Sequence, residues 1–187
     1  MNSVYTSQNT LLLNNLITFY KESDNMEKML SIINGMAPIS LRIVDWFTTN
    51  YAKKYYTVYD IPQKNSSRAK RFKVYVDYKL KLRSYSKKRF DPFCRWERIN
   101  IPYKDGTSIQ TTIGQLNFFK WGFENDVIKY IEEHYDEIET DMNNRNSTAK
   151  KKNTPVNQQT RKKREELSIS ASKTIKNEEV EIVVKFN

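Results

Sequence analysis

The chain has too few metal-binding and redox-active side chains to build most familiar catalytic centres. Its 187 residues include one cysteine, Cys94, and one histidine, His134. A single cysteine excludes an internal disulfide, which is typical of proteins in reducing compartments. Zinc centres usually take three or four nitrogen, sulfur or carboxylate ligands, and the acidic neighbours of His134 are typical of a solvated helix face. We therefore expect no metal site and no cofactor, and we expect Cys94 to be a packed thiol rather than a nucleophile.

Glycine is also scarce, and long apolar runs are missing. The four glycines form neither a Gly-x-x-x-x-Gly-Lys nor a Gly-x-Gly-x-x-Gly phosphate loop. A nucleotide-type small-molecule ligand is therefore not expected. No apolar run approaches the roughly 18 residues that a membrane-spanning helix needs, so we expect no membrane span.

One carboxylate pattern resembles the metal-binding core of nucleases. Asp60 is followed by Asp77-Tyr78-Lys79, and a strand bearing Asp-x-Lys can hold Mg²⁺ while the lysine positions an attacking water. This reading requires residues 73–79 to form a strand. Patterns this short are frequent by chance, so we predict a non-catalytic protein.

Positive charge is abundant and unevenly distributed. The net charge is +10, and twelve Lys/Arg lie between Arg68 and Arg98 against three acidic residues. Between Glu124 and Asp141, eight acidic residues accompany one lysine. Many basic proteins bind nothing charged, but clustering of this kind predicts a positive and a negative face, and it favours an acidic partner, above all nucleic acid.

Aromatic residues interrupt the basic segment throughout. Phosphates attract Lys and Arg, and unstacked bases pack on flat rings, so this mixture is typical of a nucleic-acid-binding surface. The rings are Phe72, Tyr75, Tyr78, Tyr85, Phe90, Phe93 and Trp96. The candidate nucleic-acid-binding residues are Arg68, Lys70, Arg71, Lys79, Lys81, Arg83, Lys87, Lys88, Arg89 and Arg95, with Arg161, Lys162, Lys163 and Arg164 nearer the C-terminus. The two tight clusters are also consistent with nuclear import signals or with plain solvated charge.

Hydrophobic periodicity predicts an α+β fold with a mainly helical body and one β-hairpin. We expect a loose N-terminus over residues 1–9 and a globular domain over residues 10–144. Helices are predicted from Thr10, after Ser23 or Asp24, and from Ser40, the last with Trp46 in the core. A long helix is predicted over residues 114–144. Residues 98–103 and 107–113 are β-prone, and the Lys-Asp-Gly between them is a hairpin turn signal.

The segment over residues 72–85 fits two patterns. Phe72, Val74 and Val76 begin a strict alternation with charged residues, which is typical of a strand. Val74, Tyr78 and Tyr85 also fall at the spacing of one helix face. Fourteen residues are long for a strand and ordinary for a helix, which favours the helix.

The C-terminal part changes composition. Residues 145–178 lose aromatic content and form a basic, low-complexity arm that we expect to be flexible. Residues 179–187 are predicted to form a terminal strand. This strand could return to the domain's own hairpin, or it could extend a partner's sheet edge. Its candidate partner-binding residues are Val180, Ile182, Val184 and Phe186.

Four segments resemble an uncharacterised family of small basic proteins encoded by nucleocytoplasmic large DNA viruses. The segments are Ile39–Phe47 (ISLRIVDWF), Tyr85–Arg95 (YSKKRFDPFCR), Gly114–Trp121 (GQLNFFKW) and Lys162–Ser168 (KKREELS). The resemblance covers residues 26–187. It implies a viral protein made in the host cytoplasm or nucleus, with packaging in the virion as a further option, and it brings no activity or site residues with it.

Two functions from different classes follow from these observations. The leading hypothesis is non-catalytic binding of nucleic acid, DNA or RNA, through the basic segment, assisted by the arm. The alternative is a virion structural protein, such as a minor capsid component, whose arm and terminal strand connect it to other viral structural proteins.

Overall fold

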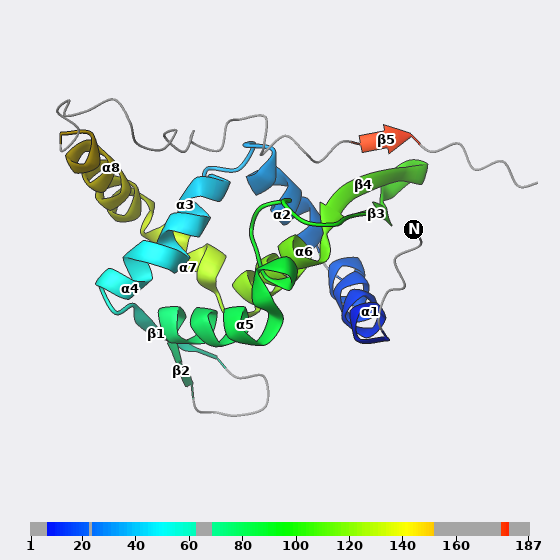
Figure 1. Cartoon of the computed structure of the whole chain (residues 1–187), viewed down its shortest axis with the longest axis horizontal. Coiled ribbons are helices and arrows are strands. Elements are labelled where there is room, and N and C mark those ends of the chain that lie inside the picture. Colours follow the sequence, from blue (N-terminus) through cyan, green and yellow to red (C-terminus); the bar gives the residue numbers. More distant parts are fainter. Residues whose placement is uncertain (1–6, 23, 63–68, 152–176, 180–187) are drawn as a thin grey trace, which may run out of the picture.

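The computed structural model describes residues 7–22, 24–62, 69–151 and 177–179, which form an α+β fold, as predicted (Figure 1). The elements in chain order are α1 (Ser7–Lys21), α2 (Asn25–Ile33), α3 (Leu41–Trp46), the π-helix η1 (Phe47–Tyr51), α4 (Ala52–Lys54), β1 (Val58–Ile61), β2 (Lys70–Lys73), α5 (Val74–Arg89), β3 (Arg98–Pro102), the 3₁₀ turn η2 (Lys104–Gly106), β4 (Thr107–Thr112), α6 (Ile113–Glu124), α7 (Val127–Glu133), α8 (Tyr135–Lys151) and β5 (Asn177–Glu179).

Helix α6 forms the centre of the core. All seven residues from Ile113 to Phe119 are buried, so this helix has no solvent-exposed face over its first two turns. It contacts α1, α2, α5 and α7. Its polar residues are satisfied inside the protein: Thr112 accepts a hydrogen bond from the Gln115 backbone N–H at 3.1 Å and caps the helix. A helix that is surrounded in this way fixes the positions of the elements packed on it.

Several helix boundaries follow the sequence signals. Ser40 caps α3, because its hydroxyl accepts from the Ile43 N–H at 3.3 Å, and α2 follows Asp24 as expected. Segment 74–89 is the helix α5. The first predicted helix begins at Ser7, so Thr10 is not its N-cap. Trp46 is half-buried rather than central to the core.

The prediction of one continuous helix over residues 114–144 is wrong. It is divided into α6, α7 and α8. Asp126 adopts a left-handed backbone conformation with φ of 53°, which interrupts the right-handed helix. Asn and Asp reach this conformation more easily than other side-chain-bearing residues, so the Asn125-Asp126 pair ends α6.

The strands form two small antiparallel sheets. β1 pairs with β2, a hairpin that was not predicted from the sequence. β3 pairs with β4 around the predicted turn, where Gly106 has φ of +74°. β5 lies on the other side of β4, with Glu179 opposite Thr107, so these residues pair with their own chain's hairpin. The candidate partner-binding residues Val180, Ile182, Val184 and Phe186 lie outside the described residues.

Candidate nucleic-acid interface

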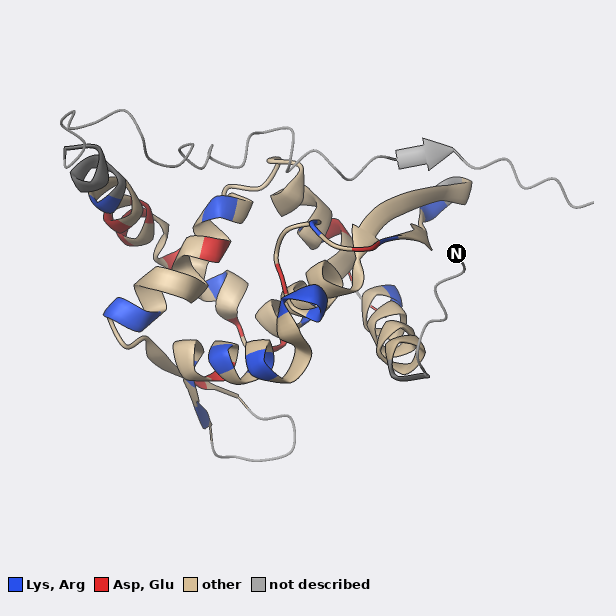
Figure 2. Ribbon diagram, in the orientation of Figure 1, with Lys and Arg blue, Asp and Glu red and all other residues tan. Residues whose placement is uncertain are grey.

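The predicted basic segment forms an exposed surface on β2 and α5. Helix α5 packs Val74 and Tyr78 inward, while Lys79 and Arg83 lie one turn apart on its exposed side. Figure 2 shows the Lys and Arg positions along α5, with others on the neighbouring α4 and β2. We call the following exposed residues the basic surface: Lys53, Lys70, Arg71, Lys73, Lys79, Arg83, Lys87 and Lys88.

Two members of the basic surface, Lys53 and Lys73, were not among the predicted site residues. Lys53 is distant in sequence but its ammonium group lies 5.8 Å from the centre of the Tyr75 ring of α5. Lys73 directly precedes α5 and is exposed. The basic run around it in the sequence is the signal that could have identified Lys73, whereas Lys53 required the packing of α4 on α5.

Within the described part of the chain, acidic side chains form no ion pair with the basic surface. The ion pairs found there involve Lys54, Arg95, Lys104, Lys120 and Lys129. None includes a cation of the basic surface. The acidic residues gather on α7 and α8, where Glu132, Glu133, Asp136 and Glu137 are exposed. The predicted separation of positive from negative charge is therefore present between α5 and the α7–α8 region (Figure 2).

The C-terminal turn of α5 is held by the buried helix α6. Ser86 has a φ of 60° and ψ of 168°, which bends the chain before Lys87. The Asn117 side-chain amide donates to the Arg89 carbonyl at 2.8 Å. A Cβ on Gly114 would lie 2.9 Å from the Lys88 carbonyl oxygen, so α6 touches this turn directly. Backbone contacts thus position the Lys87–Arg89 turn while leaving the Lys87 and Lys88 side chains exposed.

Three predicted residues are placed less favourably for phosphate contact. Lys81 is half-buried on the side of α5 that faces Lys120 and Trp121. Arg89 is half-buried. Arg95 forms two hydrogen bonds with the Asp91 carboxylate, at 2.7 and 2.9 Å, so its charge is already paired. The predicted residues Arg68, Arg161, Lys162, Lys163 and Arg164 lie outside the described residues.

The aromatic rings of the segment mostly point away from solvent, contrary to the expected base-stacking role. Phe72, Tyr78 and Phe90 are buried. Phe90 contacts Phe118 and Trp121 of α6, with ring centres 5.3 and 5.6 Å apart. The remaining half-buried rings are Tyr75, Tyr85 and Phe93. Trp96, which is 40% exposed and lies 6.0 Å from the Lys88 ammonium group, is the ring of this set most accessible to a base.

Three of the segments that carry the family resemblance meet behind the Lys87–Arg89 turn. Burial raises the pKa of Asp45 in α3 to about 6; Asp91 adds to the effect, whereas Arg95 and Lys87 oppose it. Asp91 itself is 4% exposed and pairs with Arg95. The hydrogen bond from the Gln115 side chain to the Pro92 carbonyl, at 2.9 Å, connects the same segment to α6. Residues far apart in sequence thus form one charged cluster.

The nuclease pattern is not assembled. Residues 74–79 are helical rather than extended, and the Asp77 carboxylate accepts a hydrogen bond from the Trp121 ring N–H at 2.6 Å. His134 stacks on Tyr130 with ring centres 4.0 Å apart, and Cys94 is buried. Within the described ranges, no three His, Cys, Asp or Glu side chains are grouped so that they could hold a metal ion.

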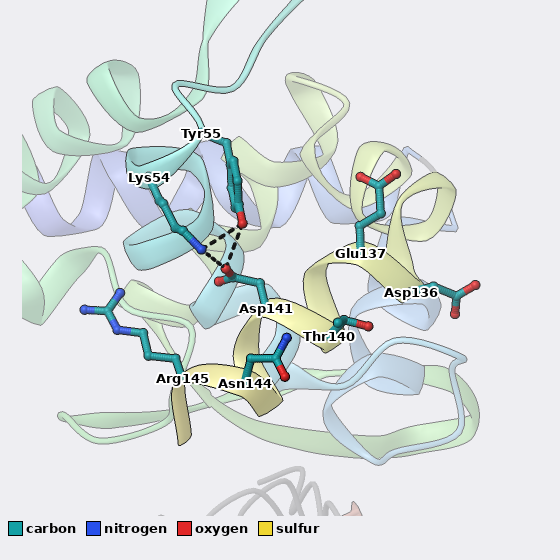
Figure 3. Close-up of a pocket in the computed structure, with 8 residues that line it drawn as sticks. All are labelled: Lys54, Tyr55, Asp136, Glu137, Thr140, Asp141, Asn144 and Arg145. Atoms are coloured by element: carbon teal, nitrogen blue, oxygen red, sulfur yellow. Dashed lines mark hydrogen bonds and ion pairs between the residues drawn. The ribbon is translucent and has the colours of Figure 1, made fainter. Parts of the chain in front are cut away.

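A buried carboxylate organises the region beside the basic surface. Asp141 of α8 accepts from the Tyr55 hydroxyl at 3.0 Å and pairs with Lys54 (Figure 3). It also accepts from the Trp46 ring N–H at 3.1 Å. Burial alone would raise the pKa of Asp141, but hydrogen bonds from Lys54, Tyr55 and Trp46 outweigh it, so the pKa is lowered. Asp141 lies about 90 positions from these three partners in the chain, and no sequence signal connects them.

Among the described helices, none combines the length and the apolar character that crossing a membrane requires.

Comparisons with known proteins identify the family. The chain matches a model for a family of unknown function, DUF7197, over residues 2–185. It is 44% identical over 136 residues to uncharacterized protein L507 of Acanthamoeba polyphaga mimivirus, an alignment that covers 70% of this chain and 51% of the relative. The chain therefore spans about half the length of that relative. No solved structure matches. The viral relative agrees with the viral part of the resemblance seen in the sequence. The chain belongs to DUF7197, a family of unknown function, and has a relative encoded by a giant virus.

Proposed function

We propose that this protein binds nucleic acid, without catalysing a reaction on it, through the basic surface of β2 and α5. The observation that carries the proposal is the exposed row of cations on these two elements, which no described acidic residue pairs with. Cations held in this way attract phosphate groups, and binding releases the counterions of the nucleic acid. The surface offers phosphate contacts and few accessible rings, which favours binding that depends weakly on base sequence.

The viral relative indicates where the protein would act. A protein of a giant virus acts in an infected host cell, so we place this one in the host cytoplasm or nucleus, with packaging in the virion as an extension. DNA and RNA both present the phosphates that the basic surface would contact. Binding of single- and double-stranded DNA and RNA of equal length, at one salt concentration, distinguishes these targets.

Lysine footprinting tests where the nucleic acid lies. The purified protein is acetylated in the presence and absence of a 20-nucleotide DNA or RNA, and each modified lysine is located by mass spectrometry. Lys70, Lys79 and Lys88 should be protected by the nucleic acid, because they belong to the basic surface. Lys28 and Lys129, which are exposed on α2 and α7, should react equally in both samples. Equal protection of all five lysines would contradict a defined binding surface.

A second candidate function is assembly with other virion proteins through the C-terminal strand. The observation that favours it is the pairing of β5 with β4 over three residues, Thr107 to Ile109. Backbone pairing of this kind can equally be made by a strand from a neighbouring molecule. Removing residues 177–187 should then abolish incorporation into particles while leaving nucleic-acid binding in place. Normal incorporation of the shortened protein would exclude this role of the strand.

A further inference from the structure

We propose that a cleft between η1, α4, α5 and α8 binds a phosphate group of the bound nucleic acid. This inference rests on the proposed function and assigns it a specific subsite. The cleft has a volume of about 340 Å³ and is lined by Thr49, Asn50, Lys53, Lys54, Tyr75 and Arg145. Three of these six residues are cationic and none is acidic, which is the lining that a phosphate group requires.

The polar floor of the cleft is a π-helix. In η1 the Ala52 N–H bonds to the Phe47 carbonyl, five residues earlier, so the turn is wider than in an α-helix. Phe47 and Tyr51 are buried on its inner side, and Thr49 and Asn50 line the cleft on the other. Isolated π-turns are rare and occur frequently at functional sites. We take the unusual turn as support for the cleft that is independent of its charge.

Hydrogen bonds fix the polar side chains of this turn. The Thr49 hydroxyl donates to the Asp45 carbonyl at 2.6 Å, and the Asn50 amide donates to the Thr49 hydroxyl oxygen at 2.8 Å. An amide group has a second N–H, and a hydroxyl accepts further bonds. The two side chains are thus oriented before a ligand arrives, which lowers the entropic cost of binding.

The three cations of the cleft are also supported by neighbouring groups. Lys54 pairs with Asp141, and Arg145 lies over the Trp46 ring, with its guanidinium carbon 5.5 Å from the ring centre. Lys53 lies 5.8 Å from the centre of the Tyr75 ring. Asp141 accepts bonds on both oxygens, from Trp46 on one and from Lys54 and Tyr55 on the other. The charges of Asp141 and Lys54 therefore offset each other, so Lys53 and Arg145 are the cations that would meet a phosphate in the cleft.

The neighbouring pocket is less suited to phosphate. It is larger, about 680 Å³, and shares Lys54 and Arg145 with the cleft. Asp136, Glu137 and Asp141 also line it, and Figure 3 shows Asp136 and Glu137 on the side away from the two cations. An anion there would meet like charges. The smaller cleft adjoins α5 through Tyr75, one turn before Lys79, so a strand that crosses the basic surface can place one phosphate in it.

Inorganic phosphate and a 20-nucleotide oligothymidylate are the probes that test this inference. Phosphate is titrated into the protein at constant ionic strength and followed by backbone amide NMR, and the oligonucleotide is followed by fluorescence anisotropy. We expect saturable shifts at Asn50 and Lys53. Lys53→Gln should weaken both phosphate and oligonucleotide binding by about tenfold, since it removes a charge-assisted contact. Lys53→Arg should retain most of the affinity, and Lys28→Gln, which makes the same change on α2, should have little effect.

Three outcomes would contradict phosphate binding in the cleft, and they can be told apart. Weak shifts at all exposed cations, changed equally by Lys53→Gln and Lys28→Gln, would show an adventitious ion only. Oligonucleotide binding that is unaffected by Lys53→Gln would exclude the cleft while the proposed function survives. Failure of both probes to bind the wild-type protein would exclude the function as well. Asn50→Asp, which adds a carboxylate without removing a cation, provides a second variant and should also prevent phosphate binding.

Discussion

The Asn117 side-chain amide in α6 donates a hydrogen bond to the Arg89 carbonyl, with a nitrogen–oxygen distance of 2.8 Å. This bond connects α6, the most buried of the described helices, to the Lys87–Arg89 turn at the end of α5. A surface helix end that is held from below by buried polar groups keeps its exposed side chains in a fixed arrangement. The positions of Lys87 and Lys88 therefore depend on residues that contact no ligand.

Removing this bond should cost stability. In Asn117→Ala the Arg89 carbonyl loses its donor, and a partly buried carbonyl without a donor destabilises by about 1–3 kcal/mol. Urea unfolding at neutral pH measures the change. Asn100→Ala, which alters an exposed asparagine of β3, is the matched control and should stay within about 0.5 kcal/mol of the wild type. Equal effects of the two substitutions would show that the bond contributes nothing.

Two glycines of α6 should respond to alanine in opposite ways. Gly114→Ala forces a methyl group to 2.9 Å from the Lys88 carbonyl oxygen, so the basic turn must move, at a cost of about 1–3 kcal/mol. At Gly122 the nearest atoms, from the Ile128 side chain, are 3.5 and 3.6 Å away, which is ordinary contact. Gly122→Ala should therefore be neutral or stabilise the helix by up to about 1 kcal/mol. The melting temperatures of both variants measure these effects. A higher melting temperature for Gly114→Ala would contradict the close packing of α6 on the Lys87–Arg89 turn.

The raised pKa of Asp45 predicts a pH-dependent stability. The folded-state pKa of about 6 exceeds the ordinary 3.8, so the folded protein binds this proton more tightly, and its stability falls as the pH rises through this window. Asp45→Asn removes the ionised form and should stabilise the protein at pH 7.5 by about 1–3 kcal/mol. The gain should shrink at pH 4. Asn100→Ala, which changes an exposed uncharged residue on β3, should show no such trend. A stabilisation by Asp45→Asn that does not change with pH would contradict the raised pKa of Asp45.

Asp141 should behave in the opposite sense. Its pKa is lowered in the folded protein, so its contribution to stability is complete above the ordinary carboxyl pKa and is lost as the pH falls below it. Asp141→Ala leaves Lys54, Tyr55 and Trp46 without their common acceptor. The cost at pH 7.5 should be about 1–3 kcal/mol and should decline in acid. Urea titrations at pH 7.5 and at acidic pH measure how this cost changes. A cost that grows on acidification would contradict the hydrogen bonds assigned to Asp141.

The local signals of the sequence predicted what depends on a few neighbouring residues. Ser40 caps α3 because a serine hydroxyl can reach the backbone three residues later, and Gly106 supplies the positive φ of the β3–β4 turn. The length of the segment over residues 72–85 correctly favoured a helix, which begins at Val74, although Phe72 and Lys73 belong to β2. These features are decided within one or two turns of chain.

Features that depend on packing partners could not be predicted in this way. The spacing of Phe72, Tyr78 and Phe90 does not reveal that their rings face α6, and so their role in the core was missed. The β1–β2 hairpin was missed because β2 is a short basic run with one buried residue, Phe72. The link between Lys54 and Asp141 joins distant helices.

The salt dependence of nucleic-acid affinity tests the central claim most directly. The dissociation constant for one oligonucleotide is measured over a range of salt concentrations for the wild type, for the triple variant Lys79→Gln, Arg83→Gln and Lys88→Gln, and for a control with Lys21, Lys28 and Lys129 changed to Gln. Each lost phosphate contact reduces the slope of log K against log salt by about 0.7–0.9, so the triple variant should lose about 2–3 from its slope. The control should keep the wild-type slope. Equal slopes for all three proteins would contradict binding through the basic surface.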